Sequence, residues 1–92
     1  MTFDMFQEYI EEHILEGWKS DVELDVAMVT KNNGVQLRGL YIKSKEMNVS
    51  PAIYLDEYYS YYLKGESLEE IIRRIREEYE WKISRVADYH FK

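Results

Sequence analysis

The chain contains no cysteine, which excludes a disulfide framework and any zinc site built from thiolates. Only His13 and His90 are available as histidine bases or histidine ligands. No apolar run is long enough to cross a bilayer, and nothing resembles a signal peptide, because Asp4, Gln7 and Glu8 interrupt the first apolar residues. We therefore expect a cytoplasmic protein with no membrane partner.

Catalytic groups are also scarce. Nucleophilic catalysis needs a serine or cysteine near a base that a third group orients, and no such set is evident. His13 and Glu16 supply two metal ligands at most, and the many carboxylates have the spacing of solvent-facing groups. No glycine-rich phosphate loop exists, because the glycines are isolated at Gly17, Gly34, Gly39 and Gly65. We predict a non-enzymatic protein with no metal site and no cofactor.

Residues 21–45 predict a β-hairpin whose register follows from its apolar pattern. A two-residue loop at Asn33 and Gly34 would place Leu24 opposite Lys43, which mixes apolar and charged side chains on one face. A three-residue loop with a left-handed Gly34 instead keeps one face apolar. That register has the following pairs: Leu24 with Ile42, Val26 with Leu40, Glu23 with Lys43 and Asp21 with Lys45. We predict the three-residue loop.

A helix is expected before the hairpin, and a short strand after it. The helix begins at Thr2 or Asp4, runs to about Glu16 and stops at Gly17. Its apolar stripe consists of Phe3, Phe6, Ile10 and Ile14. Residues 49–55 predict a third strand beside the second, at an edge that tolerates Pro51.

Two helices follow. Asp56 is the expected N-cap of the first, which Gly65 ends, and Ser67 with Glu70 has the capping-box spacing for the second. The apolar stripe of the last helix comprises Leu68, Ile71, Ile72, Ile75, Tyr79, Ile83 and Val86. Trp81 falls off this stripe, so either it is an exposed anchor or the helix breaks near Glu80 and the tail turns back.

The order α-β-β-β-α-α predicts an α+β fold in which helices cover one face of a three-stranded antiparallel sheet. Ninety-two residues suffice for one modest core, so we expect a single domain over residues 1–92.

Charge argues against direct nucleic-acid binding, although α-β-β-β-α order also occurs in double-stranded-RNA-binding domains. The net charge is −6, and a nucleic-acid reader needs a basic strip. The arginines of the last helix are matched within it at i, i+4, as Glu69 with Arg73, Glu70 with Arg74, Arg74 with Glu78 and Arg76 with Glu80.

The first helix, in contrast, carries acidic residues without matching bases. Residues 1–25 contain eight acidic residues and one lysine, and successive carboxylates at i, i+4 repel each other. One interpretation is a solvated, solubilising face. The other is a strip that occupies a basic groove of a partner protein, formed by Asp4, Glu8, Glu11, Glu12 and Glu16.

Aromatic residues make a second candidate surface. A helix cannot point all of its tyrosines one way, so we expect at least one pair to be partly exposed. The candidates are Tyr58, Tyr59, Tyr61 and Tyr62, with Trp81 on the last helix. The alternative is that these rings cap a small core.

Two segments carry a family resemblance, NNGVQLRGLYI (residues 32–42) and SPAIYLDEYYSYYLKGESLEEIIRRI (residues 50–75). An N-N-G-V turn, a P-x-I-Y-L segment and a paired-aromatic helix are similar to an uncharacterised domain of bacterial proteins, which implies no catalytic residues. The architecture and acidity also resemble small phage anti-CRISPR proteins.

We therefore expect a non-enzymatic protein-binding domain. Its most concrete form is an acidic inhibitor or nucleic-acid mimic whose partner has a basic surface, such as a nucleic-acid-binding protein or nuclease. The alternative is a regulatory or assembly module that acts through the tyrosine-rich surface, with a possible homodimer.

Overall fold

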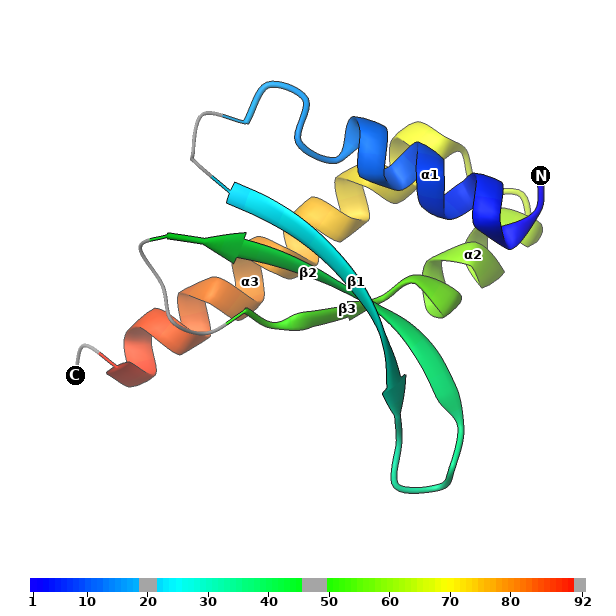
Figure 1. Ribbon diagram of the computed structural model, residues 1–92. Coiled ribbons are helices and arrows are strands. Elements are labelled where there is room, and N and C mark those ends of the chain that lie inside the picture. The colour runs from blue at the N-terminus through cyan, green and yellow to red at the C-terminus, as the bar shows by residue number, and fades with distance from the viewer. Residues whose placement is uncertain (19–21, 46–49, 91–92) are drawn as a thin grey trace.

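The computed structural model describes residues 1–18, 22–45 and 50–90, except for the side chains of residues 86–90. In chain order the elements are α1 (Phe3–His13), β1 (Val22–Thr30), β2 (Gln36–Ser44), β3 (Ala52–Tyr54), α2 (Leu55–Leu63) and α3 (Leu68–His90). The strands form an antiparallel sheet in the order β1-β2-β3, with the helices packed beside it (Figure 1). The predicted α+β fold and order of elements are confirmed.

The β1–β2 hairpin has the predicted register. Leu24 lies opposite Ile42, and Gly34 adopts the left-handed conformation, with φ of +83°. The Lys31 N–H donates to the Val35 carbonyl at 2.8 Å, which closes the three-residue loop. Of the predicted acid–base pairs, Glu23 does lie opposite Lys43, whereas Asp21 lies outside the described residues. The Lys43 ammonium contacts Asp25 diagonally, at 3.2 Å.

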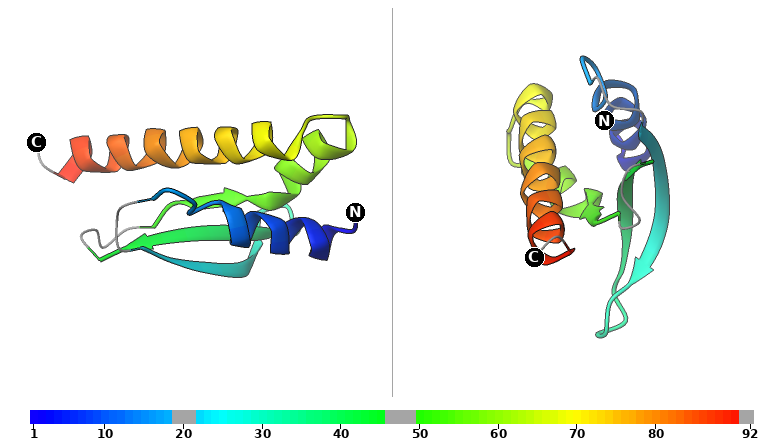
Figure 2. Two further views of the ribbon diagram at one scale, coloured as in Figure 1. Left: turned by 90° about the horizontal axis from the view of Figure 1, so that it is seen from above. Right: turned by 90° about the vertical axis from the view of Figure 1, so that its left-hand side faces the viewer.

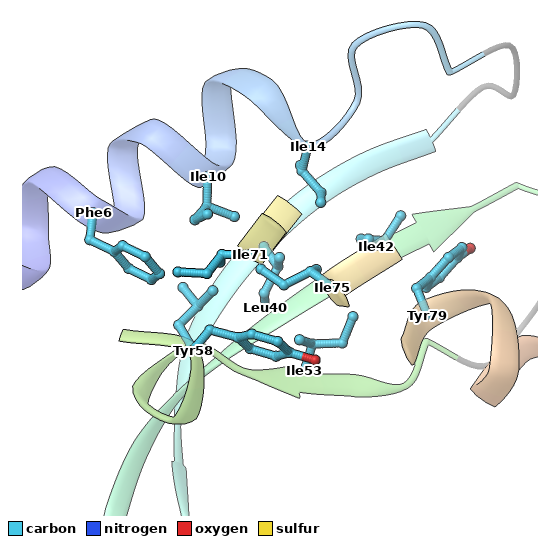
Figure 3. Close-up of a cluster of buried hydrophobic side chains, with 11 residues drawn as sticks. Phe6, Ile10, Ile14, Leu40, Ile42, Ile53, Tyr58, Ile71, Ile75 and Tyr79 are labelled. Carbon is cyan, nitrogen blue, oxygen red and sulfur yellow. The ribbon is translucent and has the colours of Figure 1, made fainter. Parts of the chain in front are cut away.

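All three helices contribute to one apolar core on one face of the sheet. Leu40 and Ile42 of β2 point to this face, and Ile53 of β3 joins them. Figure 3 shows side chains from the helices converging on these residues. The members from the helices, together with Ile14 just after α1, are Phe6, Ile10, Ile14, Leu55, Tyr58, Ile71, Ile75 and Tyr79. The predicted apolar stripe of the first helix therefore faces the core, with Phe3 partly buried at its start.

Helix α1 begins as predicted and ends early. The Thr2 hydroxyl accepts a hydrogen bond from the Met5 N–H at 3.2 Å, so Thr2 is the N-cap. The last helical residue is His13 and not Glu16. The early end has a physical reason, because Arg76 of α3 binds backbone carbonyls in this segment. Gly17, with φ of +73°, lies in the turn that follows.

The junction between β3 and α2 corrects two predictions. Strand β3 is shorter than residues 49–55, and Val49 lies outside the described residues. Asp56 is not the N-cap of α2, because Tyr54 holds that position without a side-chain bond. Asp56 Oδ1 instead accepts the Arg38 N–H of β2 at 2.7 Å. Strand β3 has already ended at this point, so the carboxylate supplies the hydrogen-bond acceptor that a further strand residue would have provided.

Helix α3 starts and continues as the sequence indicates. The Ser67 hydroxyl accepts the Glu70 N–H at 3.1 Å, and the helix is unbroken to His90. The alternative of a break near Glu80 is therefore wrong. Ile71, Ile75 and Tyr79 of the predicted stripe are buried, whereas Val86 lies outside the described side chains. Figure 2 shows α3 running along the sheet.

One polar network links α2 to α3 at the edge of the core. The Tyr58 hydroxyl donates to Glu78 Oε1 at 2.5 Å, and the other Glu78 oxygen lies 2.7 Å from Lys82 Nζ. Lys82 also donates to the Ala52 carbonyl of β3 at 2.8 Å. Burial, followed by the hydrogen bond to Glu78, raises the pKa of the Tyr58 hydroxyl well above its ordinary value of 10.0.

This shifted pKa predicts a loss of stability in alkali. A folded-state pKa above the unfolded value stabilises the fold below pH 10.0 and ceases to do so as pH rises above it. We expect the free energy of unfolding, measured with urea, to fall between about pH 9 and about pH 11. Tyr58→Phe should remove part of that fall. Tyr59→Phe, which loses only an exposed bond to the Met1 carbonyl, should retain it. Equal pH dependence in both variants would contradict the assignment.

Candidate functional site

The outward side of α1 carries a compact group of carboxylates. Glu8 and Glu12 are exposed, and Glu11 is partly exposed beside them. No ion pair joins any of the three to a basic side chain within residues 1–18, 22–45 and 50–90. We refer to Glu8, Glu11 and Glu12 as the α1 acidic face. Their mutual repulsion has no counterion in the described part of the fold.

Asp4 does not belong to this uncompensated group, which corrects the sequence prediction. Arg38 of β2 places Nη1 2.7 Å from Asp4 Oδ1 and 3.0 Å from Gln7 Oε1. The guanidinium also lies over the Phe3 ring, 4.3 Å from its centroid. The hairpin brings this arginine under the first turn of α1, so the charge of Asp4 is balanced within the molecule.

Glu16, at the other end, is also partnered. Its Oε1 lies 2.5 Å from Nδ1 of His13, and the residue follows the helix because α1 ends at His13. Arg76 reaches the same segment from α3 and donates to three carbonyls. The distances are 2.9 Å to Ile14, 3.3 Å to His13 and 2.6 Å to Glu16. A positive side chain at the C-terminal end of a helix also interacts favourably with the helix dipole.

The ion pairs on α3 differ from most of those predicted. Glu70 and Arg74 approach within 3.7 Å, as predicted. Arg73, however, pairs with Glu70 and Glu77 and not with Glu69. Arg74 binds Glu66 at 2.8 Å, because Glu78 is held by Tyr58 and Lys82. Arg76 is directed to α1 and not to Glu80. Three of the four predicted pairs are therefore absent: contacts with other elements take Glu78 and Arg76, whereas Arg73 pairs with other glutamates of its own helix.

Three of the four α2 tyrosines have structural contacts. Tyr58 is 6% exposed, and its hydroxyl donates to Glu78 at the edge of the depression that Tyr61 and Trp81 also line. The Tyr59 ring packs against Phe3 in a tilted arrangement with centroids 4.8 Å apart, and the centroids of Tyr62 and Phe6 are 5.8 Å apart. These two rings, which remain partly exposed, fasten α2 to α1.

Tyr61 and Trp81 are the exposed aromatic residues of the predicted set. Trp81 is 57% exposed and Tyr61 is 39% exposed, and both line a shallow depression between α2 and α3. An arginine already lies on each ring. Arg74 is 5.3 Å from the Tyr61 centroid, and Arg85 is 4.6 Å from the Trp81 centroid. The surface can therefore hold cationic groups by cation–π contact.

Other classes of site have little support in this fold. Within the described residues, no three His, Cys, Asp or Glu side chains are grouped to hold a metal ion. In the same part of the chain, no helix is both long and apolar enough to span a membrane. The α1 acidic face and the Tyr61–Trp81 depression remain as the candidate contact surfaces.

Comparison with known proteins gives a family but no activity. No curated protein and no solved structure matches the chain significantly. A family model described as "Family of unknown function (DUF5688)" matches residues 3–91, which include all six helices and strands. The protein therefore belongs to the DUF5688 family, whose function is unknown.

Proposed function

We propose that this domain is a non-enzymatic binding protein whose α1 acidic face engages a basic surface of another protein. The most concrete form of the proposal is an inhibitor that mimics nucleic acid and blocks a nucleic-acid-binding protein, as small phage anti-CRISPR proteins do. The observation that carries it is the lack of any ion pair to Glu8, Glu11 and Glu12 in the described residues.

The geometry of α1 supports this mode of contact. The Cβ atoms of residues three or four apart on a helix lie about 5 to 6 Å from one another, so the three glutamates form a row of closely spaced negative charges, as phosphates do along a nucleic-acid strand. The helix is held rigidly on its opposite side, where Phe6 and Ile10 are fully buried. A fixed row of negative charge loses little conformational entropy on binding and accelerates association with a basic groove.

Competition with nucleic acid tests the proposed blocking. The immobilised full chain is incubated with an extract of its source organism, with and without added double-stranded DNA or RNA. We expect nucleic-acid-binding proteins to be retained, and we expect the added nucleic acid to displace them. Retention of proteins that nucleic acid cannot displace would contradict mimicry, even if the domain binds protein.

The second candidate is a regulatory or assembly module that uses the Tyr61–Trp81 depression. The exposure of both rings favours it, because tyrosine and tryptophan give large contact areas at low entropic cost. We expect Tyr61→Ala with Trp81→Ala to abolish partner capture if this surface is the binding site. Under the first proposal the same double variant should bind nearly as well as the parent chain.

A further inference from the structure

The tip of the β1–β2 hairpin, residues 31–35, contains the only Asn-Gly step of the chain, Asn33–Gly34. Such a step is chemically reactive, because glycine has no side chain to hinder the approach of its backbone nitrogen to the asparagine side chain. Every residue of the tip is exposed, and the hairpin extends beyond the helices (Figure 1), so water reaches the step freely.

The reaction open to this step is deamidation. The backbone nitrogen of Gly34 attacks Cγ of Asn33, and the new C–N bond closes a succinimide ring. The side-chain amide group leaves as ammonia and takes the proton that the nitrogen has lost. Water then opens the ring at either of its two carbonyl carbons, which leaves aspartate in one case and isoaspartate in the other.

The turn holds the reacting groups in the wrong conformation for ring closure. The Gly34 N–H donates to the Lys31 carbonyl at 2.9 Å. Neither Asn32 nor Asn33 has a positive φ, so this is a type I turn, in which ψ of the third residue is about 0°. At that ψ the Gly34 nitrogen is rotated away from Cβ of Asn33, whereas the succinimide ring needs it rotated toward Cβ.

Both reacting groups are also hydrogen-bonded. The bond to Lys31 engages the proton that the Gly34 nitrogen must lose. Asn33 Oδ1 accepts the Val35 N–H at 3.1 Å, which holds the side-chain amide in place. Ring closure therefore requires the tip to open and these hydrogen bonds to break.

We propose that Asn33 is a deamidation site that the closed hairpin protects and that opening of the hairpin tip exposes to reaction. The inference stands apart from the proposed partner contact, because it uses the hairpin tip and not α1.

The two products differ in whether the hairpin can close again. Aspartate keeps a side-chain oxygen that accepts the Val35 N–H. Isoaspartate lengthens the backbone by a methylene group, so the loop no longer matches the closing pair of Thr30 with Gln36. Opening of the tip is thereby recorded as a lasting chemical change.

Deamidation rates of the full chain test this protection. The folded chain in mildly alkaline buffer is compared with the same chain in concentrated urea and with a peptide of residues 30–36, too short for a stable hairpin. Mass spectrometry of proteolytic fragments follows the reaction at Asn33. We expect the folded chain to react at least about tenfold more slowly than the peptide, which corresponds to an opening free energy of about 1.4 kcal/mol or more. The chain in urea should approach the rate of the peptide. A folded chain as fast as the peptide, or a chain in urea as slow as the folded one, would overturn the proposal.

A variant that loosens the tip provides a second test. Leu37 lies opposite Val29 next to the tip, and Leu37→Ala removes most of one side of this cross-strand pair. Leu63→Ala on α2 is the control, because Leu63 is 65% exposed and lies outside the hairpin. We expect Asn33 to deamidate about two- to fivefold faster in folded Leu37→Ala than in the parent chain, and at the parent rate in Leu63→Ala. Urea unfolding establishes that both variants are folded. No acceleration by Leu37→Ala, or equal acceleration by both changes, would contradict a reaction through the open tip.

Discussion

Arg76→Met is expected to lower the free energy of unfolding by roughly 2 to 3 kcal/mol, because charged hydrogen bonds contribute about 1.5 to 3 kcal/mol each and partial solvation reduces their sum. Arg76 donates to the carbonyls of His13, Ile14 and Glu16, which lie at the end of α1 and in the turn that follows it. Methionine retains the apolar stem of arginine and its helix propensity, so the change isolates the guanidinium. Urea unfolding, followed by circular dichroism, measures the loss.

Arg73→Met is the matched control on the same helix. Arg73 contacts only the exposed carboxylates of Glu70 and Glu77, and exposed ion pairs contribute little. We expect a much smaller loss of stability than for Arg76→Met. If the two variants unfold alike, Arg76 does not anchor α1 to α3, and the early end of α1 needs another explanation.

Changing Glu8, Glu11 and Glu12 together to glutamine should weaken binding to a basic partner at least about tenfold, mainly through slower association. Glutamine has nearly the same size and helix propensity as glutamate, and none of the three carboxylates has an ion pair among the described residues. The fold should therefore be unchanged or slightly more stable, because like charges at i, i+4 are removed. The effect is measured as the association and dissociation rates of each variant on a partner protein that is immobilised on a sensor surface.

The control for this variant changes Glu57, Glu77 and Glu80 to glutamine on α2 and α3. It alters the net charge by the same amount on a different surface. Partner affinity should fall only slightly in the control. A larger loss in the control would move the binding site to the surface around Tyr61 and Trp81.

Much of the backbone could be predicted because its signals are local. Apolar and polar residues alternate along β1 and β2, and only one register of the two strands gathers the apolar residues on one face. The observed pairing of Leu24 with Ile42 follows from that register. Ser67 caps α3 because a hydroxyl three residues before Glu70 reaches its N–H. Exposure of Trp81 followed from its position off the apolar stripe.

The electrostatic partners could not be predicted in this way, because they join residues far apart in sequence. Arg38 reaches Asp4 only after the hairpin has packed against α1, and Arg76 reaches the end of α1 only when α3 lies beside it. Local i, i+4 counting assigned Arg76 to Glu80 and left Asp4 unbalanced. The three residues of the α1 acidic face are what remains after these distant contacts are included.

The dependence of partner affinity on salt tests the central claim most directly. Affinities of the parent chain and of the Glu8, Glu11 and Glu12 to glutamine variant are measured between about 0.05 and 0.5 M NaCl, a range over which exposed charges become strongly screened. We predict that parent affinity falls steeply with salt and that the variant shows a much flatter dependence. Parallel salt dependences at equal affinity would contradict a binding role for the α1 acidic face.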